Sequence, residues 1–219
     1  MLSDSRGKHL FFLLKIELQV FIMLKQCMKS CKKLVNYTFV LTLGYKGELT
    51  IKQIKFNCYS LPHLLGVHKL NDLNNKTRRK IKKEINNLKL SDKNIQIIEN
   101  SNFYSQISDR LEILTRMMDI FNNKNIKVHF RSNRHTGTRT KINWDYLINF
   151  ELDNQNGYIF FVCDKNVQDS LVCNSLFFNE TTKYEAGQKR YVVLKIELID
   201  DKSHKIELYK KDGFIDPID

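Results

Sequence analysis

The first sixty residues change from a helical to an alternating pattern of apolar side chains. Apolar residues recur at helical spacing from about His9 to Val35, which predicts an amphipathic helix. The segment Tyr37–Leu43 then alternates and is rich in β-branched and aromatic residues, and Gly44-Tyr-Lys-Gly47 follows it. This order predicts a β-hairpin whose second strand runs from Glu48 to Phe56.

The middle of the chain reads as helical. Pro62 fits the first turn of a short helix that ends at Gly66. A basic helix is expected from Asn74 to Leu90, with its apolar residues on one side. A further helix is expected from Ser105 to Phe121, where apolar residues recur close to heptad spacing.

The last third consists of short runs that are rich in β-branched and aromatic residues, which are typical of strands. The runs are Ile126–Phe130, Tyr146–Asp153, Tyr158–Asp164, Arg190–Asp200 and His204–Tyr209. Turns are expected at Asn154–Gly157 and Asp200–Ser203, so the strands should pair as antiparallel hairpins. The predicted fold class is therefore α+β, with N-terminal helices and a hairpin packed on a twisted antiparallel β-sheet.

The domain organisation follows from the absence of any obvious linker. The chain has only two prolines and no low-complexity tract. Residues 25–219 are therefore predicted to form a single α+β domain, and residues 1–24 an N-terminal apolar helical extension. Charged residues interrupt the apolar stretch, which is also too short for a membrane span, so no stable membrane insertion is expected.

Charge and cysteine content narrow the functional classes. Lys and Arg number 36 against 24 Asp and Glu, a formal net charge of +12, which favours a polyanionic partner such as nucleic acid or an anionic membrane surface. Five cysteines are an odd number in a chain of this size and argue against a disulfide framework. These features indicate a reducing compartment, the cytoplasm.

Two histidines and a lysine surround a glycine in the segment Tyr59–Lys69. No phosphate-binding loop, dinucleotide fingerprint or regular zinc spacing occurs in the chain, and no cofactor or metal ion is expected. His63, His68 and Lys69 suit RNA cleavage, because imidazole can remove or supply a proton near neutral pH. The alternative is that both histidines hydrogen-bond backbone groups at a helix end.

Two further segments carry candidate residues for contacts with the substrate. Basic side chains cluster in a predicted loop and could grip phosphates: Arg131, Arg134, His135, Arg139 and Lys141. At the start of a predicted strand, a phenol, an amide and two cations follow one another: Tyr184, Gln188, Lys189 and Arg190. Both segments also have a structural interpretation, as a solvated loop and as packing around the strand.

These segments together resemble a known family of phage proteins. The hairpin, Tyr59–Leu70, a helical middle, Ser175–Phe178 and Tyr184-x-x-Gly-Gln188 before a strand resemble the phage nuclease-like domains grouped with barnase, EndoU, colicin RNases and RelE. Within that group, the chain is most similar to the fourth phage-associated branch. The resemblance covers roughly residues 25–210.

The resemblance implies a compact α+β domain with a metal-independent RNase site, in proteins of phages and mobile elements that act in conflict or toxin systems. The family's His-Leu-x-Gly element corresponds to His63, Leu64 and Gly66, and its aromatic-x-x-Gly-Gln element to Tyr184, Gly187 and Gln188. The resemblance thus points to His63, Tyr184 and Gln188, and imidazole chemistry adds His68, so the predicted catalytic set is His63, His68, Tyr184 and Gln188. The implied partners are an RNA substrate and an antitoxin or inhibitor protein.

Three functional hypotheses remain open at this stage. The first is an RNA endonuclease in which His63 acts as base or acid and His68 as its partner, and Arg131, Lys69 or Lys189 stabilises the pentavalent phosphorane. Its product would be a 2′,3′-cyclic phosphate. The second is a non-catalytic basic module that binds RNA or an acidic protein, and the third is a membrane-surface protein that uses residues 9–24 as an interfacial helix.

Overall fold

The computed structural model describes residues 22–132 and 142–217. Its internal contacts divide the chain into two compact units. We call residues 1–32 with 58–115 the helical unit, and residues 33–57 with 116–219 the sheet unit. The predicted boundary at residue 24 and the predicted single domain over residues 25–219 stay predictions.

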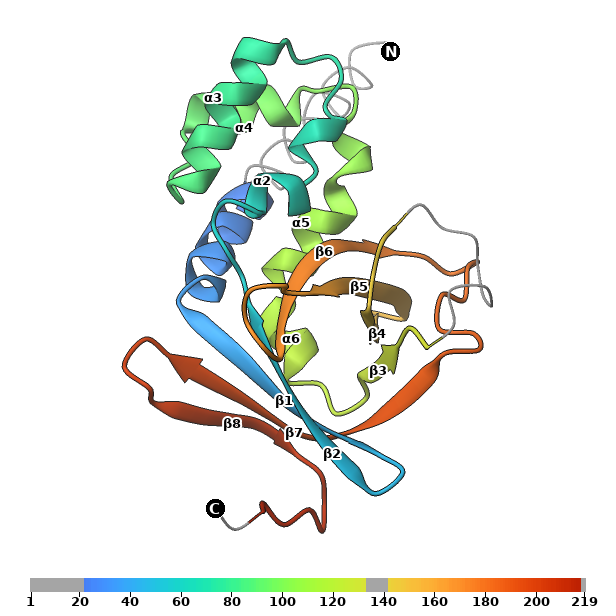
Figure 1. The fold of residues 1–219 in the computed structure, drawn as a ribbon. Helices are drawn as coiled ribbons and strands as arrows, with labels where there is room; N and C mark the ends of the chain where they lie inside the picture. Colours follow the sequence, from blue (N-terminus) through green and yellow to red (C-terminus); the bar gives the residue numbers. More distant parts are fainter. Residues whose placement is uncertain (1–21, 133–141, 218–219) are drawn as a thin grey trace, which may run out of the picture. The chain divides into compact units, whose positions relative to one another are not determined.

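The described part of the helical unit consists of short helices and 3₁₀ turns (Figure 1). A helix over residues 22–34 begins in it and buries Leu24, Cys27 and Cys31. The following elements are α2 (Leu61–Leu64), the 3₁₀ turn η1 (Val67–Lys69), α3 (Asn75–Asn86), α4 (Asp92–Glu99), η2 (Tyr104–Gln106) and α5 (Ser108–Thr115). The short helix at Pro62 and the basic helix are confirmed, whereas α4 was not predicted.

The long helix predicted over Ser105–Phe121 is wrong, because the segment is broken. It forms η2, α5 and, in the sheet unit, α6 (Met117–Phe121). Arg116 between α5 and α6 has φ −102° and ψ 16°. The hydroxyl of Thr115 donates to the backbone oxygen of Leu111 at 2.6 Å, a bond from Thr to the preceding turn that bends helices.

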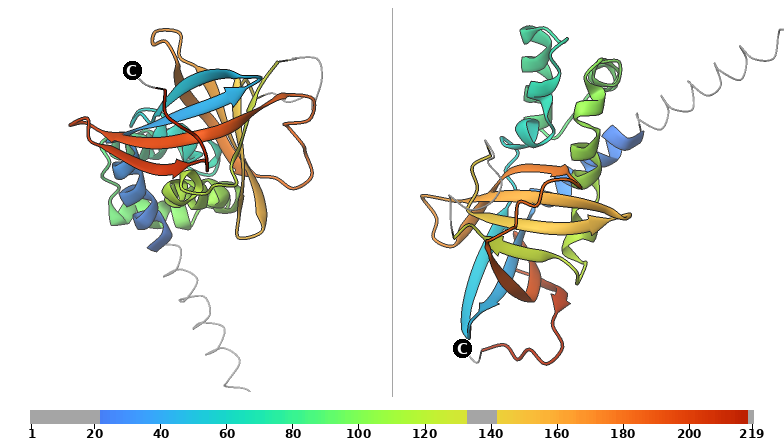
Figure 2. Two further views of the ribbon diagram at one scale, coloured as in Figure 1. Left: turned by 90° about the horizontal axis from the view of Figure 1, so that it is seen from below. Right: turned by 90° about the vertical axis from the view of Figure 1, so that its right-hand side faces the viewer.

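The described residues of the sheet unit form eight strands, which Figure 1 labels. They are β1 (Tyr37–Tyr45), β2 (Glu48–Lys55), β3 (Lys127–Phe130), β4 (Tyr146–Leu152), β5 (Gln155–Cys163), β6 (Ser170–Phe178), β7 (Lys189–Asp200) and β8 (Lys205–Lys210). Their order is β1-β2-β6-β5-β4-β3-β7-β8, and β1 also pairs with β7. Seven strands therefore form a closed barrel, which can be followed around in Figure 2, and β8 extends it beside β7.

The α+β class is confirmed, but the predicted arrangement of the sheet needs correction. The hairpin of β1 and β2 does not pack on the sheet: it is part of it and closes the ring between β7 and β6. The pairing of β2 with β6 is parallel, at Gln53↔Ser170 and Ile54↔Leu171, so the sheet is not wholly antiparallel. Strand β6 itself was not predicted.

The turn between β4 and β5 also differs from the predicted one. It lies at Asp153 and Asn154, whose φ angles are 49° and 64°, whereas the prediction placed it at Asn154–Gly157. Asp and Asn tolerate this left-handed conformation, which a two-residue hairpin turn needs. Gly157 instead lies inside β5, where a Cβ atom would stand 2.2 Å from Cζ of Phe150.

Strand residues alternate between two faces of the sheet, and both faces are covered by protein. On one face, Val128, Ile148 and Ile159 are neighbours across β3, β4 and β5. On the opposite face, His129 is the neighbour of Leu147, which in turn is opposite Phe160. Trp144, Leu147, Tyr158 and Phe160 form a buried cluster there, with Ile142, Phe177 and Tyr184 packed against it. We call these seven residues the aromatic cluster.

Candidate functional site

A tight turn in the helical unit brings two of the predicted histidines together. His63 lies in α2 and His68 in η1, and Gly66 between the two elements has φ 78°. A Cβ atom on Gly66 would lie 2.8 Å from Cγ2 of Ile107, so both the backbone conformation and the space favour glycine. The two imidazole rings stack, with centroids 4.8 Å apart and planes inclined by 14°.

Partial burial and nearby positive charge keep His68 neutral. Although His68 is exposed as a whole, its pKa is lowered to about 4, first by partial burial of its ring and then, in decreasing order, by the charges of His63, Arg110, Lys69 and Lys82. Its imidazole is therefore unprotonated at pH 7 and can accept a proton. A proton on either stacked ring disfavours a second one on the other.

The lysine of the predicted site lies beside the histidines. Burial and the charge of Arg110 lower the pKa of Lys69, and Asp109 opposes this shift. The Lys69 ammonium donates to the backbone oxygen of Gln106 at 3.3 Å. His63, His68 and Lys69, which the sequence analysis grouped from their spacing, are therefore neighbours in the folded chain.

Arg110 is a member of this site that the sequence analysis missed. It comes from α5, is only 7% exposed, and its Nη1 donates to the backbone oxygen of Leu64 at 3.2 Å. It therefore ties the end of α2 to α5. One signal was available: Arg110 stands three residues after Ile107 and four before Leu114, on the apolar side of the helix. We call His63, His68, Lys69 and Arg110 the histidine cluster.

The predicted catalytic pair Tyr184 and Gln188 belongs to the sheet unit. The ring of Tyr184 packs edge-on against Tyr158 and Phe160, with centroid distances of 5.1 and 5.2 Å. The backbone N–H of Gln188 donates to the backbone oxygen of Glu185 at 3.0 Å. Tyr184 thus has an evident packing role, and catalysis by either residue stays a prediction.

Two predicted cations of the sheet unit lie over aromatic rings. The ammonium of Lys189 is 5.5 Å from the ring centre of Tyr45, and the guanidinium carbon of Arg131 is 5.4 Å from that of Trp144. Such contacts hold a cation in place without neutralising its charge.

The other predicted basic residues divide between one exposed strand residue and a loop. Arg190 is exposed on β7, in register with His129 of β3. Arg134, His135, Arg139 and Lys141 lie outside the described residues.

The described residues contain neither a metal-binding cluster nor a membrane-spanning helix. Within residues 22–132 and 142–217, no three His, Cys, Asp or Glu side chains gather in a way that could hold a metal ion. None of the helices in this part of the chain is long and apolar enough to cross a membrane.

Comparison with family models assigns the chain to a family. The model PBECR4, described as phage-Barnase-EndoU-ColicinE5/D-RelE like nuclease4, matches residues 23–213. The chain belongs to this family. The match spans the histidine cluster and all eight strands and confirms the resemblance drawn from the sequence. No curated protein and no solved structure matches the chain.

Proposed function

We propose that this protein of the nuclease family is an RNA endonuclease that works without a metal ion. In this proposal the 2′-hydroxyl of one nucleotide attacks the adjacent phosphorus, and histidines transfer the protons. Membership of the PBECR4 family supports nuclease activity. The choice of RNA and of histidine chemistry is supported by the geometry of the histidine cluster.

The observation that carries the proposal is the stacked pair of histidines beside two cations. His63 and His68 have ring centroids 4.8 Å apart, and like charge disfavours two protons on such a pair. The pKa of His68 is lowered to about 4, so His68 is the member suited to accept a proton at neutral pH. We assign the donation of a proton to His63, the other member of the stacked pair.

The two roles give a balanced reaction. His68 takes the proton of the 2′-hydroxyl, while the 2′ oxygen forms a bond to phosphorus and the bond from phosphorus to the 5′ oxygen breaks. His63 gives its proton to the departing 5′ oxygen. The products are a 2′,3′-cyclic phosphate and a free 5′-hydroxyl, and one proton has moved from the substrate to the enzyme and one back.

Cations near the histidines would stabilise the negative charge that builds up on the phosphorane oxygens. Lys69 is half-buried beside His68 and is our candidate for this contact. Arg110 is almost fully buried and acts on the reaction through its bond to Leu64, so it is a positioning residue. Arg131 and Lys189 of the sheet unit stay candidates for binding the RNA backbone.

The experiment is digestion of total RNA and a tRNA pool in EDTA, followed by analysis of the fragment ends. Wild-type protein is compared with His63→Ala and with His204→Ala, an exposed histidine at the turn before β8. We expect cyclic-phosphate ends from wild type and from His204→Ala, and no fragments from His63→Ala. Cleavage that EDTA abolishes, or that leaves 5′-phosphate ends, would contradict the mechanism.

The binding module inferred from the charge is the alternative outcome of the same experiment. It predicts that the protein binds RNA tightly and that incubation leaves the RNA intact. Salt dependence cannot separate the two functions, because both rely on phosphate contacts. The His63→Ala variant separates the two functions, because in an enzyme this substitution removes cleavage and retains affinity for RNA.

The proposal includes the cellular compartment and the partner protein that the family resemblance implies. The substrate is RNA in the cytoplasm of a bacterial host, and an inhibitor protein or antitoxin is the expected partner. An enzyme that cuts cellular RNA is toxic to the cell that makes it. Expression of the wild-type chain should therefore slow growth, whereas expression of His63→Ala should not.

A further inference from the structure

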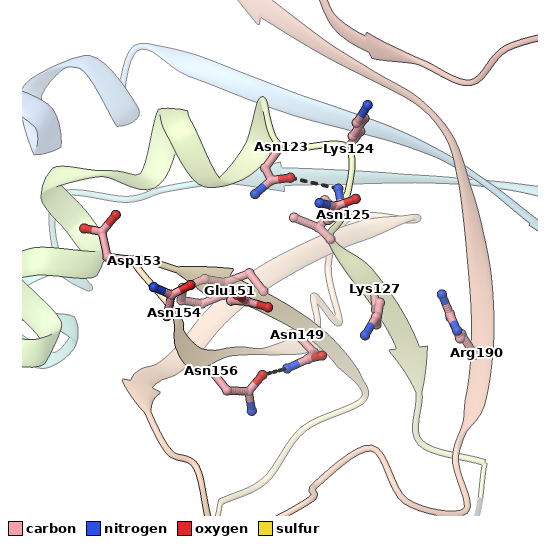
Figure 3. A pocket seen from close by; sticks show the side chains of 12 residues that line it. Asn123, Lys124, Asn125, Lys127, Asn149, Glu151, Asp153, Asn154, Asn156 and Arg190 are labelled. Carbon is pink, nitrogen blue, oxygen red and sulfur yellow. Dashed lines mark hydrogen bonds between the residues drawn. The ribbon is translucent and has the colours of Figure 1, made fainter.

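Two adjoining hollows lie in the sheet unit beside β3 and β4. Their volumes are about 750 and 410 Å³. Lys127, Asn149, Asn154 and Asn156 line both of them. The larger one reaches Arg190 of β7 (Figure 3). We call the two together the β3–β4 hollow; no residue of the histidine cluster lines it, and of the site residues predicted from the sequence that the structure describes it includes only Arg190.

Two cations at this hollow have no acidic partner. Lys127 and Arg190 are both exposed, and in the described part of the chain neither forms an ion pair within 4.0 Å. Four carboxylates also line the hollow: Glu151, Asp153, Glu180 and Glu185. Asp153 is already paired with Arg116, and Glu185 accepts a hydrogen bond from the Tyr158 hydroxyl at 2.9 Å. The two cations are therefore available for an anionic ligand.

Side-chain amides in the hollow are held in fixed orientations. Nδ2 of Asn149 donates to Oδ1 of Asn156 at 2.6 Å and to the backbone oxygen of Gly157 at 3.3 Å. Nδ2 of Asn156 donates to the backbone oxygen of Asn179 at 3.1 Å. Amides carry both donors and acceptors, which is the combination that reads the polar edge of a nucleobase.

A buried histidine with unused hydrogen-bonding groups adjoins the two cations. His129 is 5% exposed, and within the described part of the chain neither of its ring nitrogens has a hydrogen-bond partner. It lies two residues from Lys127 on the same face of β3 and in register with Arg190 on β7. A buried polar group without a partner costs about 1–3 kcal/mol, so such a residue calls for a functional explanation.

The charge state of His129 is sensitive to charge placed near it. Burial is the largest cause that lowers its pKa, Glu185 opposes the shift, Arg190 and Lys127 add to it, and together they bring the pKa to about 4. The ring is therefore neutral at pH 7 and carries one N–H donor and one nitrogen acceptor. Both groups are unused among the described residues.

We propose that the β3–β4 hollow binds one nucleotide of the RNA chain. The phosphate lies between Lys127 and Arg190, and the base contacts the amides of Asn149 and Asn156. His129 is not among the residues that line the hollow; its buried ring lies beside the two cations and reports the charge placed between them. Only the identity of the polymer as RNA rests on the proposed function. The hollow is a binding subsite and takes no part in the proton transfers.

The test is the affinity of a 2′-O-methyl RNA oligonucleotide, which cannot be cut by attack of its own 2′-hydroxyl. Wild type is compared with the double variant Lys127→Gln/Arg190→Gln and with Lys205→Gln, a matched control at an exposed lysine of β8. We expect the double variant to bind about tenfold more weakly, and the slope of log affinity against log salt to fall by about 0.7 per lost phosphate contact. The control should stay within about twofold of wild type.

A second measurement uses the NMR resonances of the His129 ring as a reporter of binding beside the two cations. The ring resonances of His129 should shift when the oligonucleotide is added to wild-type protein, and should shift much less in the double variant at the same concentrations. Unchanged affinity of the double variant, absence of binding by wild type, or ring resonances that do not respond would overturn the proposal.

The two proposals can fail independently. Binding that depends on Lys127 and Arg190 in a protein that never cuts RNA would leave the subsite intact and refute the nuclease function. Cleavage that depends on His63, together with binding that ignores Lys127 and Arg190, would do the reverse.

Discussion

Among the residues that the structure describes, two histidines have a pKa lowered to about 4, one in each unit. His68 is exposed and stacks on a second histidine, with Lys69 and Arg110 nearby. His129 is buried in the sheet, without a hydrogen-bond partner among the described residues. The same lowered pKa therefore has different uses: an exposed neutral imidazole can exchange protons with a substrate, whereas a buried one can only form hydrogen bonds.

Substitution of the two histidines should have opposite consequences: loss of His68 should affect RNA cleavage, and loss of His129 should affect stability. His68→Ala should reduce the rate of RNA cleavage at least about 100-fold, because it removes the proton acceptor, and should leave the melting temperature almost unchanged. His129→Ala should lower the free energy of unfolding by about 1–3 kcal/mol, because it opens a space among packed side chains. Cleavage assays and urea unfolding of both variants check this. Full activity of His68→Ala would refute its role as base.

A second expected effect concerns the origin of the lowered pKa of His68. Arg110→Met removes a positive charge near His68 and the bond to the Leu64 oxygen. The pKa of His68 should therefore rise, and cleavage should lose activity at mildly acid pH, whereas Arg110→Lys should restore part of the wild-type behaviour. NMR titration of the His68 ring measures the pKa. A merely structural Arg110 would leave that titration where it is.

The smallest expected effect is the dependence of stability on pH. The pKa of His129 is about 4 in the folded protein and about 6.5 in an unfolded chain, so only the unfolded state takes up a proton between these values. Stability should therefore be complete well above pH 6.5 and fall as the pH drops toward 4, by at most about 1.4 kcal/mol per pH unit from this residue. Urea unfolding at pH 6.5 and 4.5 measures the loss. His129→Phe should show a smaller loss, and an equal one would exclude His129 as its source.

Much of the local structure follows from short-range patterns in the sequence. The hairpin of β1 and β2 was predicted because alternating residues flank Gly47, which has φ 87°. The His63 turn was predicted because Pro62 starts a helix and Gly66 ends it. The family resemblance and the grouping of His63, His68 and Lys69 depended on the same local features.

Features that depend on distant pairing could not be predicted. The closed barrel requires β1 to pair with both β2 and β7 and β2 to pair in parallel with β6, and no local pattern encodes these partners. From the sequence alone, His129 cannot be distinguished from an ordinary strand residue. It was singled out only because the fold places Arg190, from a strand far along the chain, opposite it. Tyr184 was predicted to be a site residue; its ring packs in the aromatic cluster, a contact that its position in the sequence does not show, and its role in catalysis stays a prediction.

In the proposed mechanism, the 2′-hydroxyl of RNA is the nucleophile and the histidine cluster activates it. The most direct measurement uses a tRNA resynthesised with a single 2′-deoxynucleotide at the position where wild-type protein cuts, incubated with that protein in EDTA. If the 2′-hydroxyl is the nucleophile, cleavage at this position should stop, while other positions in the same tRNA are cut as before. Continued cleavage at the deoxynucleotide would show that another nucleophile attacks the phosphorus and would contradict the account.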